Sequence, residues 1–142
     1  MIYFLDTSAL VKRFVSERGS AAVRSLFLRQ RTIAVSRLAH PELVASIVRM
    51  WREGRLAKDR RDEILTEILN CIAGVDHVVE VRGPLLPRVT RLLLSRPLRA
   101  YDAVQLASAL QLKVSGAVDF WSADERLVAA ARAEALRATL IA

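Results

Sequence analysis

The sequence predicts an α/β protein built on a parallel sheet. Short β-branched or apolar runs alternate along the chain with longer segments whose apolar residues recur at helical spacing. This alternation is typical of parallel sheets that carry helices on both faces. The chain has 142 residues and no visible linker, repeat or low-complexity tract, so we expect a single domain spanning residues 1–142.

Four strands are predicted, with a fifth at the end of the chain. The first is the apolar run Ile2–Leu5, which ends at Asp6. The other predicted strands are Thr32–Val35, Val78–Val81, Ala117–Trp121 and Thr139–Ile141. Right-handed crossovers connect parallel strands, so every junction from strand to helix should lie at one edge of the sheet.

Helical segments fill the intervals between the strands. The predicted helices are Ser8–Phe14, Ser20–Arg29, Leu38–Trp51, Leu56–Ala73, Gly83–Leu94, Tyr101–Lys113 and Ser122–Leu136. The mixed-charge stretch 52–63 is expected to form the solvated tip of a helical hairpin. Ser36 is expected to cap the helix after the second strand, and Ser122 with Glu125 matches a capping box.

Composition narrows the classes of function. The net charge is +7, from 22 Lys and Arg against 15 Asp and Glu, which favours an anionic partner. Most of this charge is Arg, whose guanidinium suits bidentate phosphate contacts. No apolar run reaches the roughly 18 residues of a membrane span, and no signal-peptide pattern is visible. We therefore expect a soluble, cytoplasmic protein without membrane contact.

Cysteine and histidine are scarce. Cys71 is the single cysteine, so no internal disulfide is possible, and its apolar surroundings in the sequence predict packing in the core. His40 and His77 are the two histidines and are distant in sequence. This composition argues against a zinc site.

Four acids follow strands or open helices. Asp6 follows the first strand, Glu42 comes soon after the second, and Asp124 follows the fourth. The edge rule brings these three together, where open α/β sheets bind their ligands. Asp102 lies in the first turn of its helix without a clear strand before it, so the rule does not place it. Each acid alone could instead stabilise a helix N-terminus, by about 0.3–1 kcal/mol.

Together the acids suggest a metal site. Carboxylates sharing a pocket repel one another, and some take up protons unless the charge is compensated. Mg²⁺ and Mn²⁺ bind carboxylate, water and phosphate oxygens, and a bound ion activates water and polarises a phosphoryl group. An acidic, metal-binding pocket in a basic protein suits cleavage of a phosphodiester.

Four segments carry a resemblance to a known family: Tyr3–Lys12, Pro41–Leu43, Leu98–Ala107 and Phe120–Leu127. In order and spacing they resemble the PIN-domain ribonucleases, and among them the VapC-type toxins of bacterial toxin–antitoxin pairs. The resemblance spans nearly the whole chain. It implies a three-layer α/β/α fold with strand order near 3-2-1-4-5, and Mg²⁺- or Mn²⁺-dependent endonucleolytic cleavage of RNA to products with 5′-phosphate and 3′-hydroxyl ends.

The resemblance also implies roles for single residues. Asp6 and Asp102 match the main metal ligands, and Glu42 and Asp124 match acids that bind metal directly or through water. The small polar residues expected to support the pocket are Thr7, Ser8 and Ser122. Gln105 stands where many relatives carry His, which should alter local hydrogen bonding.

The implied partners are an RNA substrate and an antitoxin protein. A homodimer is expected, with assembly into larger toxin–antitoxin complexes. The helical hairpin near residues 38–73 is the expected surface for antitoxin or dimer contacts.

The sequence also admits alternatives. Asp119 lies five residues before Asp124 and competes for the place of fourth acid; strand alternation puts it on the face of Trp121, at the start or flank of the strand, and we favour Asp124. A non-catalytic RNA-binding module is the main alternative function. A phosphotransfer enzyme with Asp6 as nucleophile would want a second Asp where Ser8 stands, and no receiver-type acid pair is visible.

Overall fold

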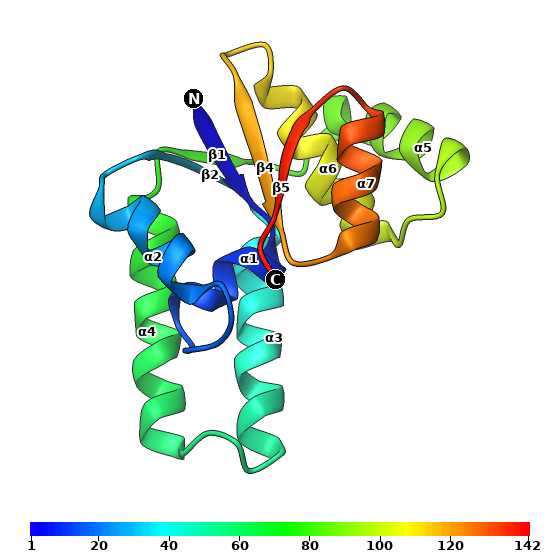
Figure 1. Cartoon of the computed structure of the whole chain (residues 1–142). Coiled ribbons are helices and arrows are strands. Elements are labelled where there is room, and N and C mark those ends of the chain that lie inside the picture. Colours follow the sequence, from blue (N-terminus) through cyan, green and yellow to red (C-terminus); the bar gives the residue numbers. More distant parts are fainter.

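The computed structural model describes all 142 residues and shows alternating strands and helices (Figure 1). The strands are β1 (Ile2–Leu5), β2 (Thr32–Ser36), β3 (His77–Val79), β4 (Val118–Ser122) and β5 (Arg137–Leu140). The helices are α1 (Thr7–Leu10), α2 (Ser20–Leu28), α3 (Ala39–Arg52), α4 (Lys58–Gly74), α5 (Leu86–Ser95), α6 (Ala100–Leu112) and α7 (Glu125–Ala133), with 3₁₀ turns η1 (Val11–Arg13) and η2 (Gly83–Leu85). No helix combines the length and the apolar character that crossing a membrane requires.

The sheet is entirely parallel, with strand order β3-β2-β1-β4-β5. β1 is central, and its Phe4 lies opposite Ala34 of β2 and Phe120 of β4. Because all strands run the same way, the junctions after β1, β2 and β4 meet at one edge. The predicted fold class and strand order are confirmed.

Helices cover both faces of the sheet. One apolar cluster joins Phe4 and Phe120, whose stacked rings lie 5.6 Å apart, to α5, α6 and α7. A second cluster joins Leu5 and Val35 to α1, α2, α3 and α4. In Figure 1 the α3–α4 hairpin extends well beyond the sheet, with the turn between the two helices at its far end. The turn, residues 53–57, lies within the stretch 52–63 predicted to form the tip, and residues 58–63 belong to α4.

Two predicted helix caps are wrong. Ser36 and Ser122 are instead the last residues of β2 and β4, because each pairs with a residue of the neighbouring strand, Val79 and Leu140 respectively. The observed caps, Leu38 of α3 and Asp124 of α7, each lie two residues after the predicted ones. Asp124 caps α7 in place of Ser122, with its Oδ1 accepting from the backbone N–H groups of Arg126 and Leu127 at 2.9 and 3.3 Å.

Several segments are shorter than predicted. The segment 8–14 is a single α-turn followed by η1, and β3 ends at Val79 rather than Val81. α7 ends at Ala133 because Ala135 takes a left-handed conformation, with φ of 60°, and Leu136 N donates back to Ala131 O. Gly19, before α2, has φ of 89°, and a Cβ there would lie 2.6 Å from Cγ2 of Ile141, so only glycine fits.

Candidate active site

The four predicted acids line one cavity of about 370 Å³ at the carboxyl edge of the sheet. Asp6 follows β1 and caps α1, Glu42 and Asp102 lie in the first turns of α3 and α6, and Asp124 caps α7. We call this cavity the acidic cavity. Asp102, which the edge rule did not place, reaches it because α6 packs against β2 and β4 and begins at this edge.

Asp6 is the most constrained of the acids, with 4% of its surface exposed. Its Oδ1 accepts hydrogen bonds from Ser8 Oγ at 2.7 Å and from Ala9 N at 2.9 Å. Its Oδ2 accepts from Ser122 Oγ at 2.6 Å. Burial nevertheless dominates and raises the pKa of Asp6 from 3.8 to about 6, against the lowering effect of these bonds. Burial therefore disfavours the ionised form of Asp6, and a cation bound beside it would favour that form.

Two serines connect Asp6 to the loop that carries Asp124. Ser8 Oγ accepts from Ala123 N at 2.9 Å and lies 3.2 Å from Ser122 Oγ. Ser122 Oγ accepts from Asp124 N at 3.0 Å. The predicted supporting serines thus hold two acids in a fixed relation.

Glu42 is held by a separate group of hydrogen bonds. Its Oε1 accepts from Thr7 Oγ1 at 3.0 Å and from Gln105 Nε2 at 2.8 Å. Gln105 Nε2 also donates to Thr7 Oγ1 at 3.1 Å. Gln105 is 2% exposed, and its own Oε1 has no hydrogen-bond partner. Of the two polar atoms of the Gln105 amide, only the nitrogen is therefore satisfied by protein partners.

Asp102 is half-buried, and both burial and nearby charges shift its pKa. Burial is the largest influence and raises the pKa of Asp102, and the charges of Asp124 and Glu42 raise it further, while Arg99 lowers it. The carboxylates therefore repel one another across the cavity, and a bound cation would relieve this repulsion.

A divalent metal fits the donor chemistry of this cavity. The donors are carboxylate, hydroxyl and amide oxygens, which suit Mg²⁺ and Mn²⁺. No three acidic, histidine or cysteine side chains are grouped closely enough to hold one ion among them. Mg²⁺ commonly binds through one or two carboxylates and keeps several waters, which is compatible with this spacing.

Two arginines of the acidic cavity were not among the predicted site residues. Arg49 lies seven residues after Glu42 on α3, and Arg99 lies three residues before Asp102. A spacing of seven residues returns to the same face of a helix, so Arg49 could have been inferred from the position of Glu42, whereas Arg99 is the extended residue before α6. Neither forms an ion pair.

Asp119 lies outside the acidic cavity. It is the second residue of β4, buried within the sheet, opposite Tyr3 of β1 and Arg137 of β5. Its carboxylate accepts from Thr139 Oγ1 at 2.9 and 3.1 Å and lies 3.4 Å from Arg137 Nε. Thr139 and Arg137 thus compensate the negative charge of Asp119. Asp124, and not Asp119, is the fourth acid that lines the acidic cavity.

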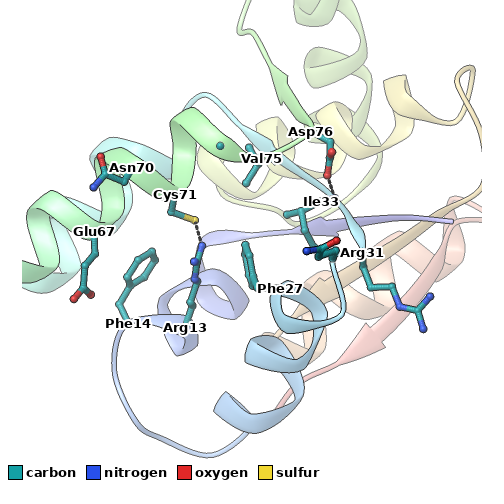
Figure 2. Close-up of a pocket in the computed structure, with 12 residues that line it drawn as sticks. Arg13, Phe14, Phe27, Arg31, Ile33, Glu67, Asn70, Cys71, Val75 and Asp76 are labelled. Carbon is teal, nitrogen blue, oxygen red and sulfur yellow. Dashed lines mark hydrogen bonds between the residues drawn. The ribbon is translucent and has the colours of Figure 1, made fainter.

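A larger cavity, of about 520 Å³, lies elsewhere, between η1, α2 and α4 (Figure 2). There Arg13 Nη1 donates to Cys71 Sγ at 2.7 Å, and the guanidinium lies 3.9 Å from the ring centre of Phe27. Cys71 is buried in the second apolar cluster, as its sequence context predicted. Burial raises the pKa of the Cys71 thiol more than Arg13 lowers it, so the thiol stays protonated. This cavity contains none of the four acids.

Comparison with known proteins agrees with the fold. The model of the PIN domain family matches residues 3–133. Ribonucleases VapC45 and VapC49, from two strains of Mycobacterium tuberculosis, are each 32% identical over 96% of this chain and 93% of their own length. The crystal structure of VapC20 of M. tuberculosis, described as a toxin that cleaves the sarcin–ricin loop, is similar with a TM-score of 0.65 and 17% identity, covering 90% of this chain and 94% of that one.

The chain belongs to the PIN-domain family, and within it to the VapC ribonucleases. The family inferred from the four sequence segments is confirmed.

Proposed function

We propose that this protein is a metal-dependent endoribonuclease and the toxin of a toxin–antitoxin pair. The observation that carries the proposal is that four carboxylates from four separate elements line one cavity, with burial raising the pKa of two of them. The similarity to VapC45 and VapC49, both named ribonucleases, supports RNA as the substrate.

Asp6 and Asp102 are the proposed direct ligands of Mg²⁺ or Mn²⁺, with Glu42 and Asp124 binding directly or through water. The bound ion would activate a water molecule and polarise the phosphoryl group. Ser8 and Ser122 hold the Asp6 carboxylate in one orientation. Such outer partners commonly change metal affinity or activity by roughly 10–100-fold.

The proposed reaction is hydrolysis of an RNA phosphodiester. The water oxygen bonds to phosphorus, the bond from phosphorus to the 3′-oxygen breaks, and that oxygen leaves with a proton. Arg49 and Arg99 are unpaired cations at the acidic cavity and would bind the phosphates of the RNA strand. The products would carry a 5′-phosphate and a 3′-hydroxyl.

Charge-neutral substitutions of the main ligands test this proposal. We expect Asp6→Asn and Asp102→Asn to cleave single-stranded RNA at least about 100-fold more slowly with Mg²⁺ or Mn²⁺, while keeping the circular dichroism of the parent. Asp59→Asn, at an exposed position on α4 outside the cavity, is the matched control and should cleave normally. If Asp6→Asn cleaves as fast as the parent, the mechanism is wrong.

A non-catalytic RNA-binding module is the second candidate. It is favoured by the net charge of +7 and by the unpaired Arg49 and Arg99, which can bind phosphates without cleavage. Such a module would bind RNA equally with and without EDTA and would leave it intact. Electrophoretic mobility of a labelled RNA under both conditions, followed by analysis of its length, separates the two functions.

We further propose an antitoxin protein as partner and a homodimer as the free state. The support is the membership of the VapC ribonucleases and the description of VapC20 as a toxin. The α3–α4 hairpin remains the proposed contact surface. Co-expression with a small neighbouring open reading frame, followed by co-purification and measurement of inhibited RNA cleavage, tests this part.

A further inference from the structure

A second pocket lies beside the acidic cavity, between the loop that precedes α6 and the exposed side of α7. It has a volume of about 530 Å³. We call it the α7 pocket. Its lining includes Arg96, Pro97, Leu98, Arg126, Ala129, Ala130 and Ala133. The loop and the helix come from distant parts of the chain, so the pocket is a product of the tertiary fold.

The α7 pocket is continuous with the acidic cavity along the surface. A shallow depression between them is lined by Ser8, Ala123, Asp124, Glu125 and Arg126. Ser8 and Asp124 also line the acidic cavity, and Arg126 also lines the α7 pocket. An RNA strand whose scissile phosphate lies at the acids would therefore reach the α7 pocket within a short length of chain.

The loop provides a second connection. Leu98 lines the α7 pocket, and the next residue, Arg99, lines the acidic cavity. A phosphate bound by Arg99 would therefore place the neighbouring part of the strand beside Leu98. The two pockets are thus joined both through Arg126 and through this loop.

The chemistry of the α7 pocket suits a nucleobase. Pro97, Leu98 and three alanines supply apolar surface, and the small alanine side chains leave room for a flat ring. No carboxylate lines the pocket, and the nearby Glu134 is paired with Arg91 and Arg96. Bases bind to proteins by this combination of apolar contact and nearby positive charge.

The two arginines of the pocket differ in availability. Arg96 is held by Glu134, with its Nε donating to Oε2 at 2.8 Å. Arg126 is exposed and forms no ion pair, so its guanidinium can contact a phosphate or the edge of a base. The positive charge available to RNA in the pocket therefore comes from Arg126.

We propose that the α7 pocket binds one nucleobase of the RNA, close to the cut, and sets the sequence preference at that position. The inference rests on the proposed ribonuclease function and adds a specificity site to it. The acidic cavity, with its contacts to phosphate, carries no information about sequence, whereas a pocket for one base discriminates by size and by hydrogen bonding at the base edge.

Filling the pocket from α7 tests the proposal. Ala129→Leu and Ala133→Leu each place a larger side chain in it from an exposed helical position, and leucine is compatible with the helix. Ala22→Leu, at an exposed position on α2 outside the pocket, is the matched control. Each protein is incubated with Mn²⁺ and a pool of single-stranded RNA of randomised sequence, and the cut ends are sequenced.

We expect the parent and Ala22→Leu to share a preference at one position near the cut. Both pocket variants should lose that preference and should cleave the preferred RNA about tenfold more slowly, since a base contact contributes on this order. Arg126→Gln should also slow cleavage of the preferred RNA, whereas Arg29→Gln, at an exposed position at the end of α2, should not.

A substrate change provides an independent measurement. Removing the base at the preferred position, to leave an abasic nucleotide, should slow the parent about tenfold and leave Ala133→Leu unaffected. Equal preferences in the parent and both pocket variants, or a parent that tolerates abasic nucleotides at every position, would overturn this inference alone. A parent that cuts no RNA in the pool would overturn the proposed function and this inference with it.

Discussion

Ser122 Oγ donates a 2.6 Å hydrogen bond to Asp6 Oδ2 and so joins the carboxyl ends of β4 and β1. The same hydroxyl accepts from Asp124 N at 3.0 Å. One serine therefore orients one acid and positions the loop of another. The arrangement depends on the parallel pairing of β1 and β4. Leu5 lies opposite Trp121, so the two strands end at the same edge of the sheet.

Removal of this hydroxyl should weaken both the fold and the site. In Ser122→Ala, Asp6 Oδ2 and Asp124 N each lose a partner, and we expect the free energy of unfolding to fall by about 1–3 kcal/mol. Ser108→Ala is the control, since Ser108 is equally buried and bonds only to the carbonyl of Val104 in its own helix. Urea unfolding measures both, and equal losses would show that Ser122 has no special role.

The stability of the metal-free protein should depend on the ionisation of Asp6. Burial raises the pKa of Asp6 from 3.8 to about 6, so the folded state binds more protons than the unfolded state between these values. The stabilisation of the folded state by protonated Asp6 is complete below about pH 4 and is lost as the pH rises through about 6. The shift in the pKa of Asp6 corresponds to about 3 kcal/mol. Asp102 shifts in the same direction.

The variant Asp6→Asn cannot ionise and isolates this effect. In EDTA, its free energy of unfolding relative to the parent should increase between pH 4 and pH 7, as measured by urea unfolding. Asp59→Asn should show no comparable trend. A pH-independent difference between Asp6→Asn and the parent would contradict the raised pKa of Asp6.

Metal binding should offset the destabilisation that ionised Asp6 causes in the folded state. A cation that binds the ionised carboxylates of the folded state stabilises it, so Mg²⁺ or Mn²⁺ should raise the Tm of the parent and EDTA should abolish the increase. Asp6→Asn and Asp102→Asn should lose most of the increase. Thermal melts and titration calorimetry provide the measurement, and an undiminished increase in both variants would place the metal elsewhere.

Gln105 should act as a positioning residue for Glu42. Gln105→Met keeps the length of the side chain but removes the donor to Glu42 Oε1 and Thr7 Oγ1. We expect kcat to fall about 10-fold or more, with a higher Mn²⁺ concentration needed for half-maximal activity and little change in KM for RNA.

Two further variants make the Gln105 prediction specific. Gln105→His restores a donor and should recover part of the activity. Gln111→Met, on an exposed position of the same helix, should behave as the parent. If Gln105→Met changed stability alone and left the metal dependence of cleavage intact, Gln105 would be a structural residue only.

Asp119 and Asp124 should differ in their effect on cleavage. Asp119→Asn removes the charge paired with Arg137 inside the sheet, so we expect a lower Tm with a normal cleavage rate. Asp124→Asn removes a carboxylate of the acidic cavity and should lower the cleavage rate with little loss of stability, since asparagine also caps helices. Rates and melting curves of the two variants, measured side by side, identify the fourth acid.

Local patterns in the sequence were sufficient for much of the fold. Ile2–Leu5 is a strand with the predicted bounds because a buried central strand is a continuous apolar run. The ends of β2 and β4 were not predictable in the same way. Ser36 and Ser122 resemble helix caps locally, and only the pairing with β3 and β5 keeps them in the sheet.

By itself, the sequence determined the alternation of strands and helices, and with it the edge where Asp6, Glu42 and Asp124 meet. These features follow from short-range periodicity and from the handedness of parallel crossovers. Only the tertiary structure decided that Asp102 completes the cavity, because its position depends on how α6 packs on the sheet. It also decided which side chains hold the acids, since Ser122 and Asp6 are separated by 116 residues and meet only when β1 and β4 pair.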